Sequence, residues 1–117
     1  NNGLAGNSST NTQIDSNVQG VFSISGAVSN FLWIDMDSAP IYAAHEEFDP
    51  TVPCRFAISS QGAPLAGGCD MVQRAQSFGV PAEFYLVEGS TNHVGYSTAQ
   101  YAEFLDEAAV FFEARIP

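Results

Sequence analysis

The sequence predicts an α/β fold, in which a mostly parallel sheet carries helices on its faces in a three-layer arrangement. Three observations predict this class. Short apolar runs alternate along the chain with two segments whose apolar residues recur at helical spacing. The run at 40–45 is almost entirely apolar, as is typical of a parallel strand covered on both faces. The order strand, strand, helix, strand, helix fits right-handed crossover connections.

The composition indicates a single folded domain. The chain has 117 residues, 45% of them hydrophobic and 14% charged, which argues against disorder and allows one small core. Thirteen acidic residues stand against three arginines and no lysine, so the formal net charge is -10. Because nucleic acids and anionic lipids are bound by Lys and Arg, we expect neither as a partner. No apolar run approaches the ~18 residues of a membrane span.

The first half of the chain predicts two strands joined by irregular segments. Residues 1–17 are rich in Asn, Ser, Thr and Gly and are expected to form a surface loop. Val, Phe and Ile predict a strand at 20–25. A connection with an apolar patch at 31–34 leads to the second strand at 40–45, and a loop is expected from there to about residue 63.

The second half predicts a helix, a strand and a helix. A helix is expected within 64–79, where Gly79 is suited to end it. Its apolar residues at helical spacing are Leu65, Cys69, Val72 and Ala75. A strand is expected at 82–88. Ser97 and Gln100 fit a capping box that begins a last helix reaching to about residue 115. The buried stripe expected of that helix is Tyr101, Leu105, Ala108 and Phe112, widened by Phe104 and Phe111.

Three strands and two helices make a thin sheet. One edge of this sheet, and one of its faces, is expected to stay open within the 117 residues. An exposed apolar edge invites association with other chains. We therefore expect further structure, upstream of the strand at 20–25, to pair with that strand.

Two of the predicted strands end in residues that carry chemistry. The strand at 40–45 leads to Asp49, and the strand at 82–88 leads to His93. Because parallel strands bring their carboxyl ends to one edge of a sheet, where ligands bind, we expect these two residues to meet. A histidine held by a carboxylate at one ring nitrogen has a fixed tautomer and a free base at the other. The pattern predicts an acid–base pair.

Four segments resemble the α/β-hydrolases, and their esterase and lipase-like members in particular. "HEEFDPTVP" is similar to the family's "H-G-x-x-D-x-x-V-P" segment, and "EGSTNHVGY" to the "x-G-x-x-H" loop after its last strand. "VQGVFSISGAV" resembles the strand that ends in "S-G-A". "FGVPAEFYLVEG" resembles the family's helix end, Gly turn and final strand. The resemblance covers about residues 18 to 115.

The resemblance implies a catalytic triad in which Asp49 is the acid and His93 is the base. The family's serine lies on a "G-x-S-x-G" elbow, and this chain contains neither that pattern nor an "H-G-G" oxyanion segment. We expect the chain to be the C-terminal part of one α/β-hydrolase domain, with the nucleophile-bearing N-terminal half as its partner. The implied reaction is hydrolysis of a small carboxylic ester without a cofactor, and the chain alone is expected to be inactive.

The resemblance also suggests roles for neighbouring residues. Trp33 and Phe31 lie in the connection from which family members often build the wall of the substrate pocket; core packing is the alternative. His45 is usually structural in the family. Glu46 replaces the family's glycine, and either crowds the loop or turns an extra carboxylate to solvent, so Glu46 and Glu47 are expected to be bystanders.

Other interpretations stay open on the sequence alone. The missing nucleophile also fits a non-catalytic binding or structural module that has kept the hydrolase shape. Glu46, Glu47 and Asp49 could supply some of the oxygen ligands of a Ca²⁺ site, or form a solvated acidic loop. Cys54 and Cys69 could form a disulfide or remain two buried thiols. A disulfide, together with the absence of lysine and the polar start, would favour secretion.

Overall fold

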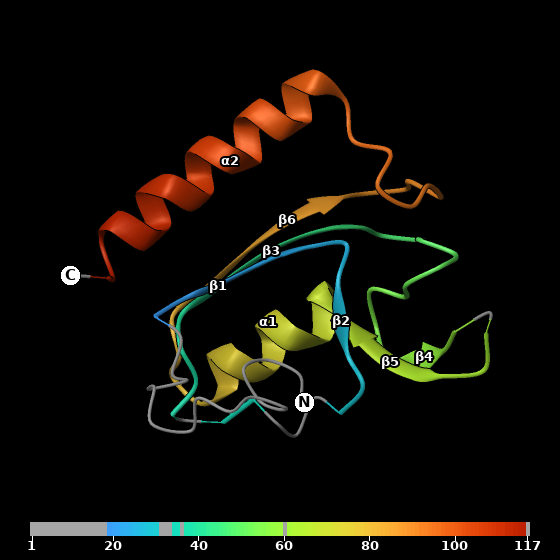
Figure 1. The fold of residues 1–117 in the computed structure, drawn as a ribbon, viewed down its shortest axis with the longest axis horizontal. Helices are drawn as coiled ribbons and strands as arrows, with labels where there is room; N and C mark the ends of the chain where they lie inside the picture. The colour runs from blue at the N-terminus through green and yellow to red at the C-terminus, as the bar shows by residue number, and fades with distance from the viewer. Residues whose placement is uncertain (1–18, 31–33, 36, 60, 117) are drawn as a thin grey trace, which may run out of the picture.

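A parallel three-stranded sheet lies between two helices in the computed structural model, which describes residues 19–30, 34–35, 37–59 and 61–116 (Figure 1). Its strands are β1 (Val21–Ile24), β3 (Ile41–Glu46) and β6 (Ala82–Val87), in the order β1-β3-β6. Both strand pairs are parallel. Helix α1 (Gly68–Ser77) covers one face and helix α2 (Thr98–Glu113) the other. The α/β class and the predicted order of these elements are confirmed.

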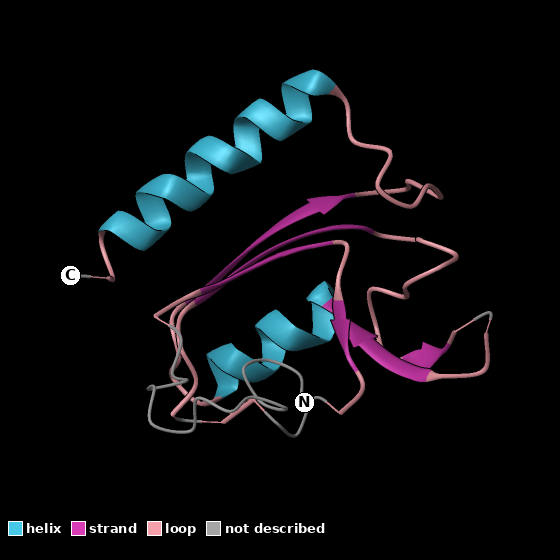
Figure 2. Cartoon of the chain, in the orientation of Figure 1, coloured by secondary structure: helices cyan, strands magenta, loops and turns pink. Residues whose placement is uncertain are grey.

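A second, antiparallel sheet lies beside the first and was not predicted. It consists of β2 (Ala27–Val28), β5 (Pro64–Gly67) and β4 (Ala57–Ile58), in the order β2-β5-β4 (Figure 2). The prediction of a helix that included Leu65 was therefore wrong at its start. Leu65 pairs with Ala57, and the helix begins only at Gly68. A proline and two glycines make this segment a poor start for a helix, and the hairpin pairing supplies its backbone hydrogen bonds instead.

Strand β3 divides the core into two layers. All six of its residues are buried, as expected for a strand covered on both faces. Because side chains alternate along a strand, Ile41 and Ala43 pack in the cluster under α1, whereas Tyr42 and Ala44 pack in the cluster under α2. The same alternation assigns His45 to the α1 face and Glu46 to the α2 face. The two polar residues that end the strand are thus directed to opposite sides of the sheet.

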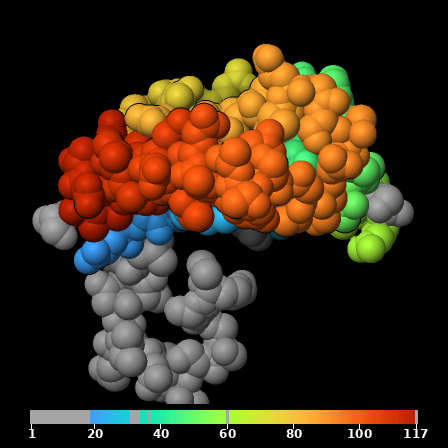
Figure 3. All heavy atoms as spheres, turned by 90° about the horizontal axis from the view of Figure 1, so that it is seen from above, coloured from blue at the N-terminus to red at the C-terminus, as the bar shows by residue number. Residues whose placement is uncertain are grey.

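Helix α2 lies along one face of the molecule (Figure 3), and its buried stripe lies within the predicted set except for Leu105. Its capping box between Ser97 and Gln100 is present. Its buried residues are Phe104, Ala108 and Phe111, while Leu105 is 47% exposed. Phe104 and Leu105 both fit the helical spacing of apolar residues. Phe104 is the buried one, because its ring contacts those of Tyr85 and Tyr96 on the side of the sheet.

The register of β3 and β6 brings two loops together. His45 is paired with Leu86 and Glu46 with Val87, so both strands end at the same level. Beyond the strands the loops continue to pair through their backbones, with Phe48 N donating to Ser90 O at 2.8 Å. The segments that carry Asp49 and His93 are therefore neighbours at the carboxyl edge of the sheet, as the sequence predicts.

Candidate acid–base site

The carboxylate of Asp49 is fully buried in the loop after β3. Its Oδ1 accepts hydrogen bonds from the backbone N–H groups of Thr51 at 2.8 Å and Val52 at 2.9 Å. This is the local turn that an aspartate forms with the backbone two and three residues further on. Because both donors belong to the loop's own backbone, Asp49 is fixed in orientation and its Oδ2 is left for another partner.

His93 is the partner of that second oxygen. Its Nδ1 lies 2.7 Å from Asp49 Oδ2, with the histidine side chain 34% exposed and that of the aspartate 0%. A carboxylate only accepts hydrogen bonds, so Nδ1 donates the proton and the neutral ring keeps a lone pair on Nε2. No hydrogen-bond partner of Nε2 occurs among the residues that the structure describes. The pair has the geometry of a base held by a buried acid.

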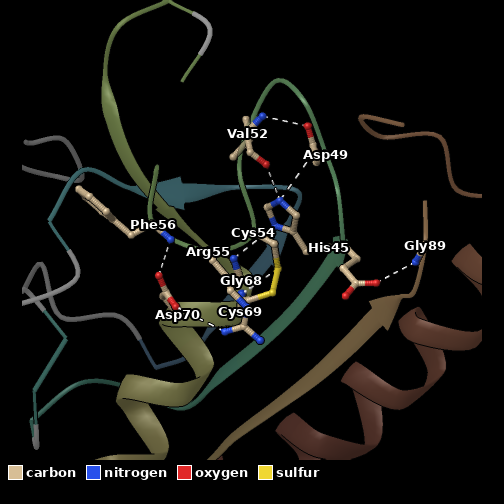
Figure 4. The surroundings of a disulfide bond; sticks show 11 residues. His45, Asp49, Val52, Cys54, Arg55, Phe56, Gly68, Cys69, Asp70 and Gly89 are labelled. Carbon is tan, nitrogen blue, oxygen red and sulfur yellow. Dashed lines mark hydrogen bonds and ion pairs between the residues drawn. A yellow bond between two sulfur atoms is a disulfide. The ribbon is translucent and has the colours of Figure 1, made fainter. Parts of the chain in front are cut away.

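His45 supports the acid loop from within the protein (Figure 4). Its Nε2 donates to Val52 O at 2.7 Å, and its Nδ1 accepts from Gly68 N at 3.3 Å. Gly68 is the first residue of α1, and its N–H is one of the groups that a helix leaves without a partner in its own first turn. With both nitrogens engaged and no exposed surface, His45 is structural.

A disulfide fastens the acid loop to the same end of α1. Cys54 is bonded to Cys69, and Cys69 N also donates to Cys54 O at 3.1 Å (Figure 4). Of the two alternatives that the sequence leaves open, the structure contains the disulfide. The loop from Asp49 to Cys54 is therefore held at one end by β3 and at the other by the helix.

Glu46 is neither turned to solvent nor the bystander that the sequence analysis expects. The side chain is 1% exposed and accepts hydrogen bonds from Gly95 N and from Ser90 Oγ. Glu47 is half-buried and accepts from Gly89 N at 2.9 Å. Both carboxylates therefore bind the loop that carries His93. Within the described parts of the chain, no group of three or more His, Cys, Asp or Glu side chains is arranged to hold a metal ion.

Ser25 and Tyr96 are further members of this edge that the sequence analysis did not identify. Ser25 directly follows β1, and its Oγ lies 2.7 Å from the hydroxyl of Tyr96, with both residues buried. Ser25 has a positive φ of 55°, which is uncommon for a residue with a side chain. In this conformation the serine makes its hydrogen bond to Tyr96, 71 positions away.

The hydroxyl of Tyr96 is expected to make the fold sensitive to alkali. Burial raises the pKa of Tyr96 to about 12; the hydrogen bond with Ser25 opposes this shift, and the charges of Glu46 and Asp49 add to it. A free tyrosine ionises at pH ~10, so the unfolded chain loses this proton at a lower pH than the folded protein does. The contribution of the neutral Tyr96 hydroxyl to the free energy of unfolding is therefore complete below pH ~10 and is lost as pH rises through the folded pKa. Tyr96→Phe should flatten the fall of stability above pH ~10, by about 1.4 kcal/mol per pH unit.

Urea denaturation at several pH values between 8 and about 12 measures this effect. Tyr101→Phe is the matched control, because its ring packs against that of Tyr96 at a centroid distance of 5.4 Å. At neutral pH, Tyr96→Phe should instead cost about 1 kcal/mol, since Ser25 loses its partner. An unchanged alkaline slope in Tyr96→Phe would contradict the assignment.

The expected pocket residues Trp33 and Phe31 lie outside the described residues. Within those residues, apolar surface near Asp49 is supplied by Phe48 and Phe56, which are 58% and 53% exposed. Together with Asp49 they border a groove of about 380 Å³ beside the acid loop. The sequence analysis gave these two phenylalanines no role, because neither belongs to a predicted strand or helix.

The fold and the site define an α/β protein with a carboxylate-held histidine at the carboxyl edge of its parallel sheet. No protein-family model, no curated protein and no solved structure matches this chain. In the part of the chain that the structure describes, none of the helices has the length and apolar character needed to cross a bilayer.

Proposed function

We propose that this chain supplies the acid and the base of a carboxylic-ester hydrolase whose serine nucleophile lies outside the 117 residues. The observation that carries the proposal is the 2.7 Å contact of His93 Nδ1 with a fully buried Asp49 carboxylate. A buried acid that is already fixed by two backbone donors serves to orient a partly exposed imidazole. That is the arrangement used by the histidine of a serine triad.

In the proposed reaction His93 accepts a proton from the attacking group and then donates it to the leaving group. Its Nε2 takes the proton of the serine hydroxyl as the serine oxygen bonds to the ester carbonyl carbon. The same nitrogen then gives this proton to the departing alcohol, whose bond to the carbonyl carbon breaks. A water molecule then gives a proton to Nε2 as its oxygen bonds to the carbonyl carbon of the acyl-serine, and Nε2 returns this proton to the serine oxygen as the serine–carbon bond breaks and the carboxylic acid is released. Throughout, Asp49 stabilises the imidazolium and holds its tautomer.

The free edge of β1 supports a partner that completes the sheet. β1 pairs with β3 on one side, and no strand pairs with its other edge among the described residues. Phe22 and Ile24 of this strand are 38% and 36% exposed, although Phe22 packs against the rings of the α2 layer. We place the N-terminal half of the hydrolase domain at this edge, where it would cover these side chains.

The disulfide bears on where the protein works. A bond between Cys54 and Cys69 persists in oxidising compartments, and none of the described cysteines is free. The proposal therefore includes a secreted or extracellular hydrolase. No cofactor is needed for the proposed chemistry.

Fluorophosphonate labelling of the protein purified from its native source tests the proposal. The expected result is label on a serine of another polypeptide in the same assembly, located by peptide mapping. In that assembly His93→Ala should abolish turnover of a p-nitrophenyl ester and leave the circular dichroism spectrum unchanged. Retained turnover in His93→Ala would overturn the assignment. Absence of label in a sample containing only this folded chain would favour the non-catalytic module.

A further inference from the structure

Glu46 is a buried carboxylate without a part in the proposed proton transfer. It is the last residue of β3 and, by the alternation of that strand, belongs to the α2 face together with Tyr42 and Ala44. Only 1% of its surface is exposed. Burying a charged side chain is costly unless hydrogen bonds replace water. The bonds that Glu46 makes therefore indicate what it does.

Both oxygens of Glu46 bind the loop that carries His93, on either side of the histidine. Gly95 N, two residues after His93, lies 3.2 Å from each oxygen. Ser90 Oγ, three residues before it, donates to Oε2 at 3.1 Å. The carboxylate thus joins the two ends of a six-residue segment, with the catalytic imidazole of the proposed mechanism between them.

The backbone inside this segment is strained. Val94 has a φ of 55°, a left-handed conformation that is an outlier for a β-branched residue. Such conformations persist where the surroundings enforce them. Here the conformation turns Gly95 N towards Glu46. If the acceptor is removed, Gly95 N loses its partner and Val94 is free to relax, which would carry the adjacent His93 away from Asp49.

We propose that Glu46 is a positioning residue that holds His93 against Asp49 through the backbone of its loop. The two carboxylates act on different parts of the loop, since Asp49 binds the ring, whereas Glu46 binds Ser90 Oγ before it and Gly95 N after it. The consequence for turnover rests on the proposed hydrolase function. The consequence for the position of the ring does not, so the two can be tested apart.

Glu46→Ala and Glu46→Gln separate the hydrogen bonds from the charge. Glutamine is close in shape, and its amide oxygen still accepts from Gly95 N, while its amide nitrogen can donate to Ser90 Oγ. Alanine removes both bonds. Glu88→Ala is the matched control, because Glu88 is an exposed carboxylate in the same loop and makes no hydrogen bond to other described residues.

The first readout is the nuclear magnetic resonance signal of the His93 Nδ1 proton in the folded chain, which reports its hydrogen bond to Asp49 directly. We expect this signal in the unaltered protein, in Glu88→Ala and in Glu46→Gln, and its loss in Glu46→Ala. Persistence of the signal in a folded Glu46→Ala protein would overturn the proposal, whatever the protein's activity.

The second readout is the split between kcat and KM for a p-nitrophenyl ester in the assembled hydrolase. A displaced base should lower kcat by about 100-fold with KM changed less than about twofold, and Glu46→Gln should restore kcat to within about fivefold. Equal loss in Glu46→Ala and Glu46→Gln would overturn positioning through hydrogen bonds. If the assembly shows no hydrolysis at all, the hydrolase proposal fails and the resonance measurement still decides this one.

Ser90→Ala keeps the proposal testable if Glu46→Ala does not fold. This variant removes the hydrogen bond from Ser90 Oγ to Glu46, together with the one that Ser90 Oγ accepts from Asn92 N, and leaves the buried carboxylate and Gly95 in place. The Nδ1 proton of His93 should then exchange with water measurably faster than in Glu88→Ala. Equal exchange rates in the two variants would overturn the role of Glu46.

Discussion

Asp49→Asn is expected to abolish ester hydrolysis by the assembled hydrolase while leaving the acid loop in place. Asparagine keeps an oxygen that can accept from Thr51 N and Val52 N, and those two donors fix which way the amide faces. The amide NH₂ then points at His93 Nδ1, where the carboxylate oxygen lies now. An NH₂ group only donates, so Nδ1 must become the acceptor and the ring proton moves to Nε2.

The proton on Nε2 is what stops the reaction. A nitrogen that already carries a proton cannot take one from serine, so kcat should fall about 10⁴-fold at neutral pH. The measurement is the turnover of a p-nitrophenyl ester, with the fold checked by circular dichroism. Glu88→Gln makes the same chemical change on an exposed residue and should leave kcat within about twofold. An Asp49→Asn assembly that retains a tenth of the turnover would refute the role of Asp49.

Gly67→Ala is expected to destabilise the fold by about 3 kcal/mol. A methyl group here would lie 2.2 Å from Pro53 O, 2.8 Å from His45 Cε1 and 2.9 Å from the Cα of Cys54. The backbone angles are not the cause, because the φ of Gly67 is -89°, which any residue adopts. The cause is space, since two of the three obstructing atoms, Pro53 O and the Cα of Cys54, belong to a backbone that the Cys54–Cys69 bond holds against α1.

The free energy of unfolding in urea measures this loss. Gly62→Ala is the control: its methyl group would meet no atom within 4 Å, and its φ of 85° should cost only about 1 kcal/mol. Equal losses in the two variants would show that the acid loop moves aside easily. A folded Gly67→Ala protein should also have a weakened contact between Asp49 and His93, because Pro53 belongs to the loop that orients the acid.

The pair at the centre of the site could be predicted because it follows from topology. Asp49 and His93 are 44 positions apart, yet each stands a few residues beyond a strongly apolar strand. Parallel pairing then leaves both loops at one edge. The strand boundaries were predicted to within one residue for β1, β3 and β6. These strands are short apolar runs between turn residues, which is the pattern that sequence reveals best.

The residues around the pair could not all be predicted, because their partners depend on tertiary packing. Glu46 stands beside Glu47 in an acidic stretch and looks like solvated surface. Extending the strand by one residue would have placed it on the buried α2 face, which is the one signal that the sequence offered. The contact of Ser25 with Tyr96 has no local pattern. Likewise, Leu105 and Phe104 both satisfy helical spacing, and only the facing rings decide between them.

The two buried carboxylates at the end of β3 also constrain how the chain folds. Asp49 and Glu46 find several of their donors in the loop that follows β6, more than 40 positions later. In a partly folded form in which β1 and β3 have paired without β6, the loop that covers Glu46 is also absent, so water can still hydrate the acids. When the last strand and the histidine loop join the sheet, the acids lose this water and gain their donors together. Dehydration of both acids is therefore coupled to the docking of the last strand.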